Sequence, residues 1–140
     1  MKKIFLTLSI FCFAFFYSQK NQNYVEISYA SICCGPPSAD PVVNYVTQFQ
    51  KKNKLKSLEV LQRSGLGREG EFSLYIGVDK LSRTQKNKFI KGLKSAINSQ
   101  NSKRDENKDG IVNFDSTMLI KKEDLAGKRK LTIYKKQNSN

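Results

Sequence analysis

The chain has 140 residues, with 25 lysine and arginine side chains against 12 aspartate and glutamate side chains, so its formal net charge is +13. It has three cysteines and lacks both histidine and tryptophan. Without histidine, the serine–histidine and cysteine–histidine dyads of nucleophilic enzymes are excluded. The composition therefore favours a binding or interaction module over an enzyme, and it indicates no cofactor.

Residues 1–18 have the form of a secretory signal peptide. Lys2 and Lys3 make a short positive segment, and residues 4–17 carry no charge. This run is shorter than the roughly 20 apolar residues that a membrane-spanning helix needs, and it is typical of a signal peptide. We expect cleavage near Ser18 or Gln19 and export to the periplasm or the cell exterior. The alternative is that the segment stays uncut as an anchor.

Cleavage would change the charge and the cysteine count of the mature protein. Loss of Lys2 and Lys3 leaves 23 basic against 12 acidic side chains, a net charge of about +11, and loss of Cys12 leaves two cysteines. About 120 residues remain, enough for one domain with a single core. We place this α+β domain at residues 19–134, with a disordered tail at residues 135–140. No transmembrane segment is expected after cleavage.

Alternating apolar residues predict an antiparallel sheet. Residues 24–29 and 72–78 alternate between apolar and other side chains, which is typical of strands with one buried face. Residues 58–61 predict another strand, and the glycine-rich segment 64–70 joins it to residues 72–78 as a hairpin. Three further short strands are predicted at residues 111–114, 118–121 and 130–134.

Two amphipathic helices are predicted between these strands. Asp40, which precedes a proline, reads as the N-cap of a helix that runs to about Asn53. Ser82 and Gln85 have the capping-box form, and a helix is predicted from residue 83 to about residue 100. The apolar faces of the helices include Val42, Val46, Phe49, Phe89, Leu93 and Ile97, and we expect these residues to face Phe72, Leu74, Ile76 and Val78.

The order of these elements is β-α-β-β-α-β, which is that of the ferredoxin-like split β-α-β plan. We therefore predict an α+β fold in which two helices cover one face of an antiparallel sheet, with an extra C-terminal strand. This plan hosts many unrelated functions, so it does not indicate one by itself.

Cys33 and Cys34 are adjacent, between the first predicted strand and the first predicted helix. Consecutive Cα atoms are about 3.8 Å apart, below the usual disulfide range of about 4.4–6.8 Å, and a bond between neighbours closes almost no loop. The pair therefore either does thiol chemistry, or one cysteine fills the core and the other bonds elsewhere. We expect no free thiol in the oxidised protein, and affinity for Cu(I), a soft metal, in the reduced protein.

The segment Ala30-Ser31-Ile32-Cys33-Cys34-Gly35-Pro36-Pro37 resembles the thioredoxin active site, in which Trp-Cys-Gly-Pro-Cys follows a strand and opens a helix. Cys34 matches the first active cysteine, Cys33 takes the tryptophan position, and Pro37 replaces the second cysteine. The placement also resembles small heavy-metal-binding ferredoxin-like domains, which carry Cys-x-x-Cys in this loop, whereas here no residue separates the cysteines. Both resemblances imply thiol redox chemistry or handling of a soft metal.

Residues 105–113 are similar to the start of a calcium-binding loop. Oxygen-bearing side chains occupy positions one, three and five, a glycine follows at position six, and an aliphatic residue stands at position eight. Position twelve holds Ser116 in place of a bidentate glutamate. A polar turn that leads into a strand is the alternative, because aspartate, asparagine and glycine all favour turns. The candidate calcium ligands are Asp105, Asn107, Asp109 and Asn113.

The basic residues gather at residues 51–56, 86–94 and 128–130. They indicate either solvated helix faces and turns or attraction to an acidic protein or an anionic envelope surface. Nucleic acid is not expected as a partner of an exported chain. Two functions stay open: a small exported binding or interaction module, and a thiol protein that handles redox equivalents or a soft metal through Cys33 and Cys34.

Overall fold

A computed structural model describes residues 22–135, so the predicted signal peptide and nearly all of the predicted tail lie outside the described residues. The described part is an α+β structure with an antiparallel sheet of six strands and three helices. None of the helices in this part is long and apolar enough to cross a membrane. In chain order the elements are β1 (Asn23–Ala30), α2 (Asp40–Lys52), β2 (Val60–Ser64), β3 (Phe72–Gly77), α3 (Arg83–Asn101), β4 (Ile111–Phe114), β5 (Ile120–Lys121), α4 (Lys122–Ala126) and β6 (Leu131–Ile133).

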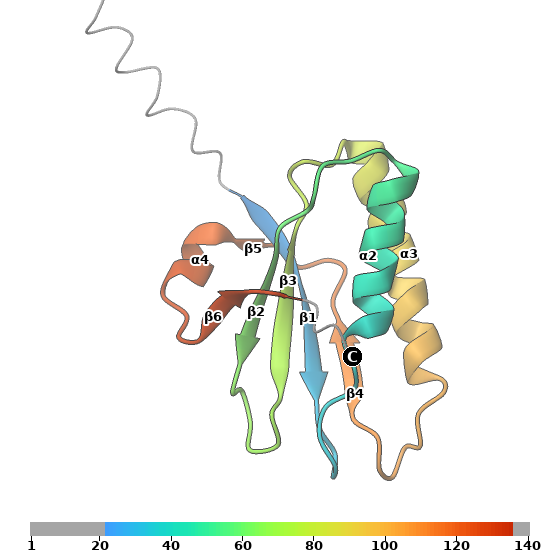
Figure 1. Cartoon of the computed structure of the whole chain (residues 1–140), viewed down its shortest axis with the longest axis vertical. Coiled ribbons are helices and arrows are strands. Elements are labelled where there is room, and N and C mark those ends of the chain that lie inside the picture. The colour runs from blue at the N-terminus through green and yellow to red at the C-terminus, as the bar shows by residue number, and fades with distance from the viewer. Residues whose placement is uncertain (1–21, 136–140) are drawn as a thin grey trace, which may run out of the picture.

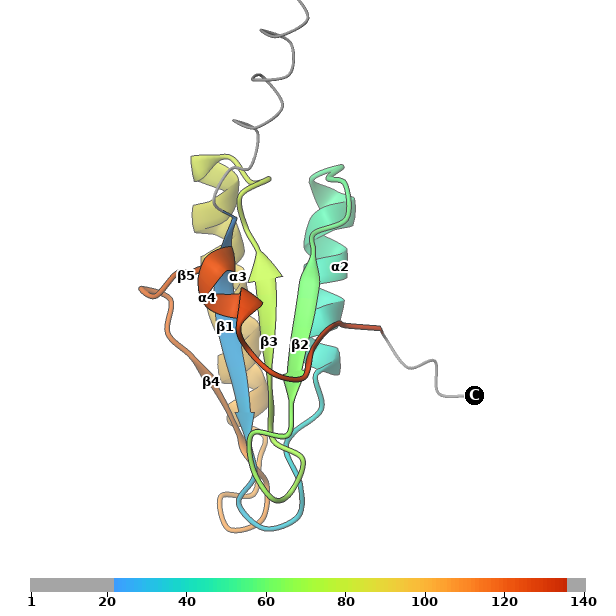
Figure 2. The same cartoon turned by 90° about the vertical axis from the view of Figure 1, so that its left-hand side faces the viewer.

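The strands are arranged in the order β4-β1-β3-β2-β6, and β5 also pairs with β1. Every pairing is antiparallel, and Ile27 of β1 stands opposite Leu74 of β3 and Phe114 of β4. Since side chains alternate between the two faces of a sheet, these three residues share a face. Helices α2 and α3 cover that face, while α4 lies on the opposite side of the sheet (Figures 1 and 2).

The core lies between the sheet and these two helices, as the sequence predicts. The helix residues and strand residues of the predicted core are buried together, except that Phe72 is only partly buried and packs against the buried cluster. Ring contacts join the two helices, with the centroids of Phe49 and Phe89 5.1 Å apart. The buried cluster also includes Val25, Ile27, Tyr29, Leu58, Leu81 and Val112.

Three predicted element boundaries are wrong. Asp40 is the first residue of α2 and does not cap it; Ala39 holds the N-cap position, and the Asp40 N–H donates to Ser38 Oγ at 3.1 Å. The strand predicted at residues 58–61 runs from Val60 to Ser64, because the hairpin pairs back to Phe72 at the start of β3. The strand predicted at residues 118–121 shortens to β5, since an exposed turn precedes it. The capping box at Ser82 is confirmed.

The opposite face of the sheet carries a second, smaller core that the sequence analysis did not predict. Leu125 of α4 packs against Tyr24 of β1 and Tyr75 of β3, and all three side chains are buried. The Tyr75 hydroxyl donates to Glu26 Oε1 at 2.8 Å, and the Tyr24 hydroxyl donates to Glu59. Helix α4 therefore covers part of the sheet face opposite α2 and α3. It buries two tyrosines whose hydroxyl groups are hydrogen-bonded.

A side chain from α3 protects the edge of the sheet that β4 forms. Strand β4 is the last strand on its side and pairs only with β1 along this edge. The Asn101 side chain donates from Nδ2 to the Val112 carbonyl at 2.8 Å and accepts from the Val112 N–H at 3.1 Å. Asn101 therefore occupies backbone groups that an added strand would otherwise use.

Candidate functional site

Three loops meet at one end of the sheet. They are the cysteine loop (residues 31–39, between β1 and α2), the hairpin loop (residues 65–71, between β2 and β3) and the α3–β4 loop (residues 102–110). Antiparallel pairing causes this, because Tyr29 near the end of β1 stands opposite Phe72, and Ala30 stands opposite Ile111. All three loops lie at the lower end of the molecule in Figure 1.

The tip of the cysteine loop carries the two cysteines. Cys33 and Cys34 are joined by a disulfide, with their Cα atoms 3.8 Å apart. Both side chains are exposed, and Ile32 before them is 49 % exposed. Neither cysteine fills the core, so that structural role does not explain the pair.

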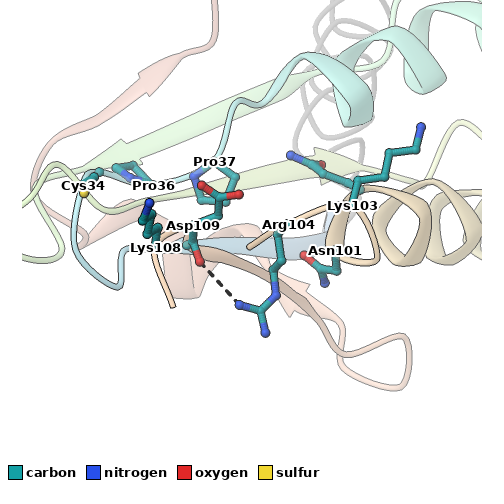
Figure 3. Close-up of a pocket in the computed structure, with 11 residues that line it drawn as sticks. Cys34, Pro36, Pro37, Asn101, Lys103, Arg104, Lys108 and Asp109 are labelled. Carbon is teal, nitrogen blue, oxygen red and sulfur yellow. Dashed lines mark hydrogen bonds between the residues drawn. The ribbon is translucent and has the colours of Figure 1, made fainter. Parts of the chain in front are cut away.

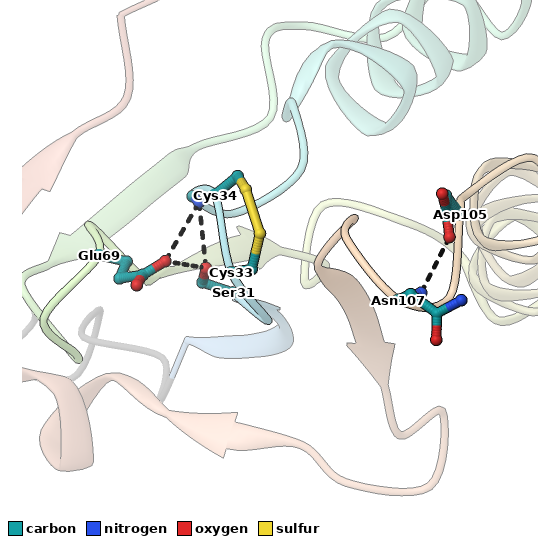
Figure 4. Close-up of a disulfide and its surroundings, with 7 residues drawn as sticks. Ser31, Cys33, Cys34, Glu69, Asp105 and Asn107 are labelled. Atoms are coloured by element: carbon teal, nitrogen blue, oxygen red, sulfur yellow. Dashed lines mark hydrogen bonds between the residues drawn. A yellow bond between two sulfur atoms is a disulfide. The ribbon is translucent and has the colours of Figure 1, made fainter.

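A glutamate of the hairpin loop holds one side of the cysteine loop. Glu69 Oε2 accepts hydrogen bonds from the Ser31 hydroxyl at 2.7 Å and from the Gly35 N–H at 3.3 Å (Figure 4). The same Gly35 N–H lies 3.1 Å from Ser31 Oγ. Gly35 has a φ of 98°, which glycine adopts without the steric cost that other residues bear.

The other side of the cysteine loop packs against the α3–β4 loop. Gly110 is buried, and a Cβ atom at this position would lie 2.1 Å from the Ala30 carbonyl oxygen and 2.8 Å from Pro37 Cδ. Gln100 Nε2, at the end of α3, donates to the Ser38 carbonyl at 2.8 Å. The two loops can approach this closely only because residue 110 has no side chain.

Between these two loops lies a cavity of about 290 Å³, which we call the basic groove (Figure 3). Its volume is near the lower end of the range for small-molecule sites, about 300–1,000 Å³. Its lining contains three cationic side chains and one carboxylate. The lining residues are Cys34, Gly35, Pro36, Pro37, Gln100, Asn101, Lys103, Arg104, Lys108, Asp109 and Gly110.

The charges of the basic groove are not neutralised locally. Arg104 Nη1 donates to the Asp109 backbone carbonyl at 3.4 Å, not to a carboxylate. Asp109 Oδ2 accepts from the Asp105 N–H at 2.8 Å. Within residues 22–135, neither Lys103 nor Lys108 has an ion-pair partner. The groove therefore presents an excess of positive charge, which attracts anions.

The candidate calcium ligands are arranged as a turn followed by a strand. Asp105 Oδ1 accepts from the Asn107 N–H at 3.0 Å, so this carboxylate and that of Asp109 are both bound to backbone of the same turn. Asn113 lies on β4, opposite Ser28. Residues 22–135 contain no group of three or more His, Cys, Asp or Glu side chains placed to hold a metal ion. Calcium binding stays a prediction.

A second cavity, of about 310 Å³, lies between α2 and β2. Its lining is mostly aliphatic, and it includes Val43, Val60 and Tyr134. It is remote from both sequence candidates, whereas the basic groove includes residues of each.

The cationic residues of the groove and the role of Glu69 were not predicted from the sequence. The predicted basic clusters lie elsewhere in the chain, because Lys103, Arg104 and Lys108 stand among acidic and polar residues. The predicted order of the elements could have indicated the groove. That order places the loop after the first strand and the loop before the fourth strand at the same end of the sheet. Comparisons of the chain with models of known protein families, with curated proteins and with solved structures find no match.

Proposed function

We propose that this protein is a small exported binding module whose ligand is an acidic segment of a partner protein, held in the basic groove. The observation that carries the proposal is the excess of positive charge around the cavity, with Lys103, Arg104 and Lys108 against Asp109 alone. A concave site suits a protruding chain segment better than it suits a flat anionic membrane surface. The net charge of the chain attracts such a partner over a longer range.

Export is part of the proposal. Residues 1–18 have the charged start and the short apolar run of a signal peptide. A disulfide at Cys33–Cys34 suits an oxidising compartment such as the periplasm or the cell exterior.

We further propose that β1-α2-β2-β3-α3-β4 follows the ferredoxin-like plan, with β5, α4 and β6 as C-terminal additions. The antiparallel order β4-β1-β3-β2 and the placement of α2 and α3 on one face support this assignment.

Calorimetric titration with a capped tetra-aspartate peptide tests the binding function. We expect the double variant Lys103→Gln/Lys108→Gln to bind about tenfold more weakly, because each lost charge removes a charge-assisted contact. The matched control is Lys88→Gln/Lys91→Gln, which removes two exposed charges from α3 at about 15 Å or more from Asn101, the end of that helix. Equal weakening in both variants would contradict the proposal, as would binding to vesicles of anionic lipid without binding to the peptide.

The alternative function is thiol redox or soft-metal handling through Cys33 and Cys34. It is favoured by the exposure of both cysteines, because a buried disulfide could not react with a partner. Handling of a soft metal requires prior reduction, since the thiolate is the ligand. Thiol titration with mass analysis, before and after mild reductant, tests this function: free thiols in the untreated protein would contradict the disulfide.

A further inference from the structure

We propose that the basic groove and the Cys33–Cys34 disulfide act on the same partner group: a cysteine thiolate flanked by carboxylates, which exchanges with the disulfide. The proposal rests on the binding function proposed above and names the chemistry of its partner. It follows from one juxtaposition, because the residue that supplies a sulfur to the disulfide also forms part of the wall of a cationic cavity.

Cys34 and the cationic side chains share this wall. Cys34 lines the groove together with Lys108, Arg104 and Lys103. Figure 3 shows Lys108 at the end of the groove where Cys34 and Pro36 lie, and Lys103 towards the opposite end. An acidic segment that lies along the groove would therefore bring a cysteine of its own towards Cys34 while its carboxylates face the cations.

The cysteine loop is held on both sides of the disulfide. Ser31 and Gly35 are bound to Glu69, while Pro37 packs on Gly110 and the Ser38 carbonyl accepts from Gln100. These contacts do not involve the sulfur atoms. Opening of the disulfide would therefore leave the walls of the groove in place, so binding and exchange can occur at one site without loss of the other.

The exchange balances without any further reactant. The partner thiolate attacks Cys34 Sγ, a new sulfur–sulfur bond forms between the partner and Cys34, and the bond to Cys33 breaks. Cys33 leaves as a thiolate, which takes up a proton from water. A second partner thiolate then attacks the mixed disulfide, so that two partner thiols are oxidised to one disulfide and the Cys33–Cys34 pair is reduced by two electrons.

The cations promote the first step by attracting the anionic partner. They raise the local concentration of an anionic thiolate, an effect that speeds association by roughly 10- to 1,000-fold and weakens as salt is added. A thiolate without flanking carboxylates carries less negative charge and is attracted less, and flanking lysines oppose the attraction, so the rate depends on the charge of the partner.

The test compares three capped tripeptides, Asp-Cys-Asp, Ser-Cys-Ser and Lys-Cys-Lys, as reductants of the purified protein. Samples are quenched with acid, and intact mass gives the rate at which the disulfide form is lost. Each rate is divided by the thiolate fraction of its peptide. At low ionic strength we expect Asp-Cys-Asp to react about tenfold faster than Ser-Cys-Ser, with Lys-Cys-Lys the slowest.

Two double variants distinguish the effect of the groove cations on the exchange rate from the effect of the overall charge of the protein. In Lys103→Gln/Lys108→Gln the advantage of Asp-Cys-Asp should fall to about twofold or less, while Lys88→Gln/Lys91→Gln should keep it. Circular dichroism spectra and melting curves confirm that both variants fold. Equal corrected rates for the three peptides in the unmodified protein would overturn the proposal, as would an advantage that both variants lose equally or that neither loses.

The rate measurement and the calorimetric titration together distinguish failure of this proposal from failure of the binding function. If capped tetra-aspartate binds in the groove but the three thiol peptides react equally, the binding function stands and the exchange is refuted. If tetra-aspartate does not bind, the binding function fails on its own. A purified protein with two free thiols would overturn the exchange at its first step.

Discussion

Two glycines fix the geometry of the site, and they do so for different reasons. Gly35 adopts a positive φ, and the cysteine loop turns back towards Glu69 at this residue. Glycine is needed here for its backbone conformation. Gly110 supplies space, because the Ala30 carbonyl and Pro37 occupy the volume that a side chain would fill. The shape of the groove therefore depends on two residues that have no side chain with which to bind a ligand.

Replacement of Gly110 by alanine should destabilise the protein by about 1–3 kcal/mol, the usual cost of overpacking. The added Cβ would lie 2.1 Å from a backbone oxygen, so relief requires that β1 and β4 move apart. Denaturant melts measure this cost. The matched control is Gly127→Ala, where no atom lies within 4 Å and the backbone is right-handed, so its stability should stay equal or rise by about 0.4–1 kcal/mol. Similar losses in both variants would contradict this explanation.

At the scale of elements, the contact between α3 and β4 closes the sheet edge. Asn101 binds both backbone groups of Val112, so one side chain replaces the neighbouring strand at that position. The same residue lies in the wall of the basic groove. Edge protection and the shape of the groove are therefore coupled.

Asn101→Ala should lower the free energy of unfolding by about 1–3 kcal/mol, because Val112 loses both partners in a partly buried position. Asn98→Ala is the control on the same helix, since that side chain is exposed and its substitution changes only helix propensity, by a few tenths of a kcal/mol. Size-exclusion chromatography should also show that only Asn101→Ala associates through its exposed edge. Two variants of equal stability would refute the role of Asn101.

A substitution on β3 tests which face of the sheet carries the main core. Leu74 is fully buried in the main core, and Leu74→Ala should cost roughly 2–5 kcal/mol. Leu66→Ala, in the hairpin loop, removes a side chain that is 41 % exposed, and its cost in the same denaturant melts should be close to zero. A small loss at Leu74 would mean that the other face of the sheet is the main core.

The core face and both long helices could be predicted from the sequence because their signals are local. Strand alternation around Leu74 and the capping box at Ser82 involve residues within a few positions of each other. Helix α4 was not predicted, because five residues carry too little periodicity, and its one buried residue, Leu125, needs Tyr24 and Tyr75 from distant strands. The cysteines could be identified from their adjacency. The rest of the site could not, since Gly110 and Lys108 gain their roles only when antiparallel pairing brings two loops together.

Tyrosines distributed over the whole molecule determine how its stability responds to alkaline pH. The structure holds several tyrosine hydroxyls in places where a phenolate would be unfavourable. Burial raises the pKa of Tyr29 far above its ordinary value of 10.0, and the nearby Tyr134 adds to the effect. Burial likewise raises the pKa of Tyr24, Tyr45 and Tyr134.

These shifts predict unfolding at alkaline pH. A folded-state pKa above the unfolded value means that the folded protein holds its protons more tightly, so the stabilisation is complete below pH 10 and is lost as the pH rises above it. Tyr29 is 1 % exposed and its hydroxyl has no hydrogen-bond partner among the described residues, so a charge there would be buried and unpaired. Denaturant melts between pH 7 and 12 should show constant stability up to about pH 10 and a decline beyond it. The absorbance of ionised tyrosine should rise together with unfolding.

Tyr29→Phe separates the buried phenol from the general effect of alkali. It removes an unpartnered hydroxyl, so at pH 7 the variant should be equally stable or more stable by about 1 kcal/mol, and its alkaline transition should move to higher pH. Tyr45→Phe is the contrasting variant, because the Tyr45 hydroxyl donates to the Phe89 carbonyl at 2.9 Å, and its loss should cost about 1 kcal/mol at pH 7. If Tyr29→Phe unfolds at the same alkaline pH as the unmodified protein, then ionisation of Tyr29 does not drive the transition. In that case ionisation of the other tyrosines with raised pKa values, Tyr24, Tyr45 and Tyr134, becomes the better explanation.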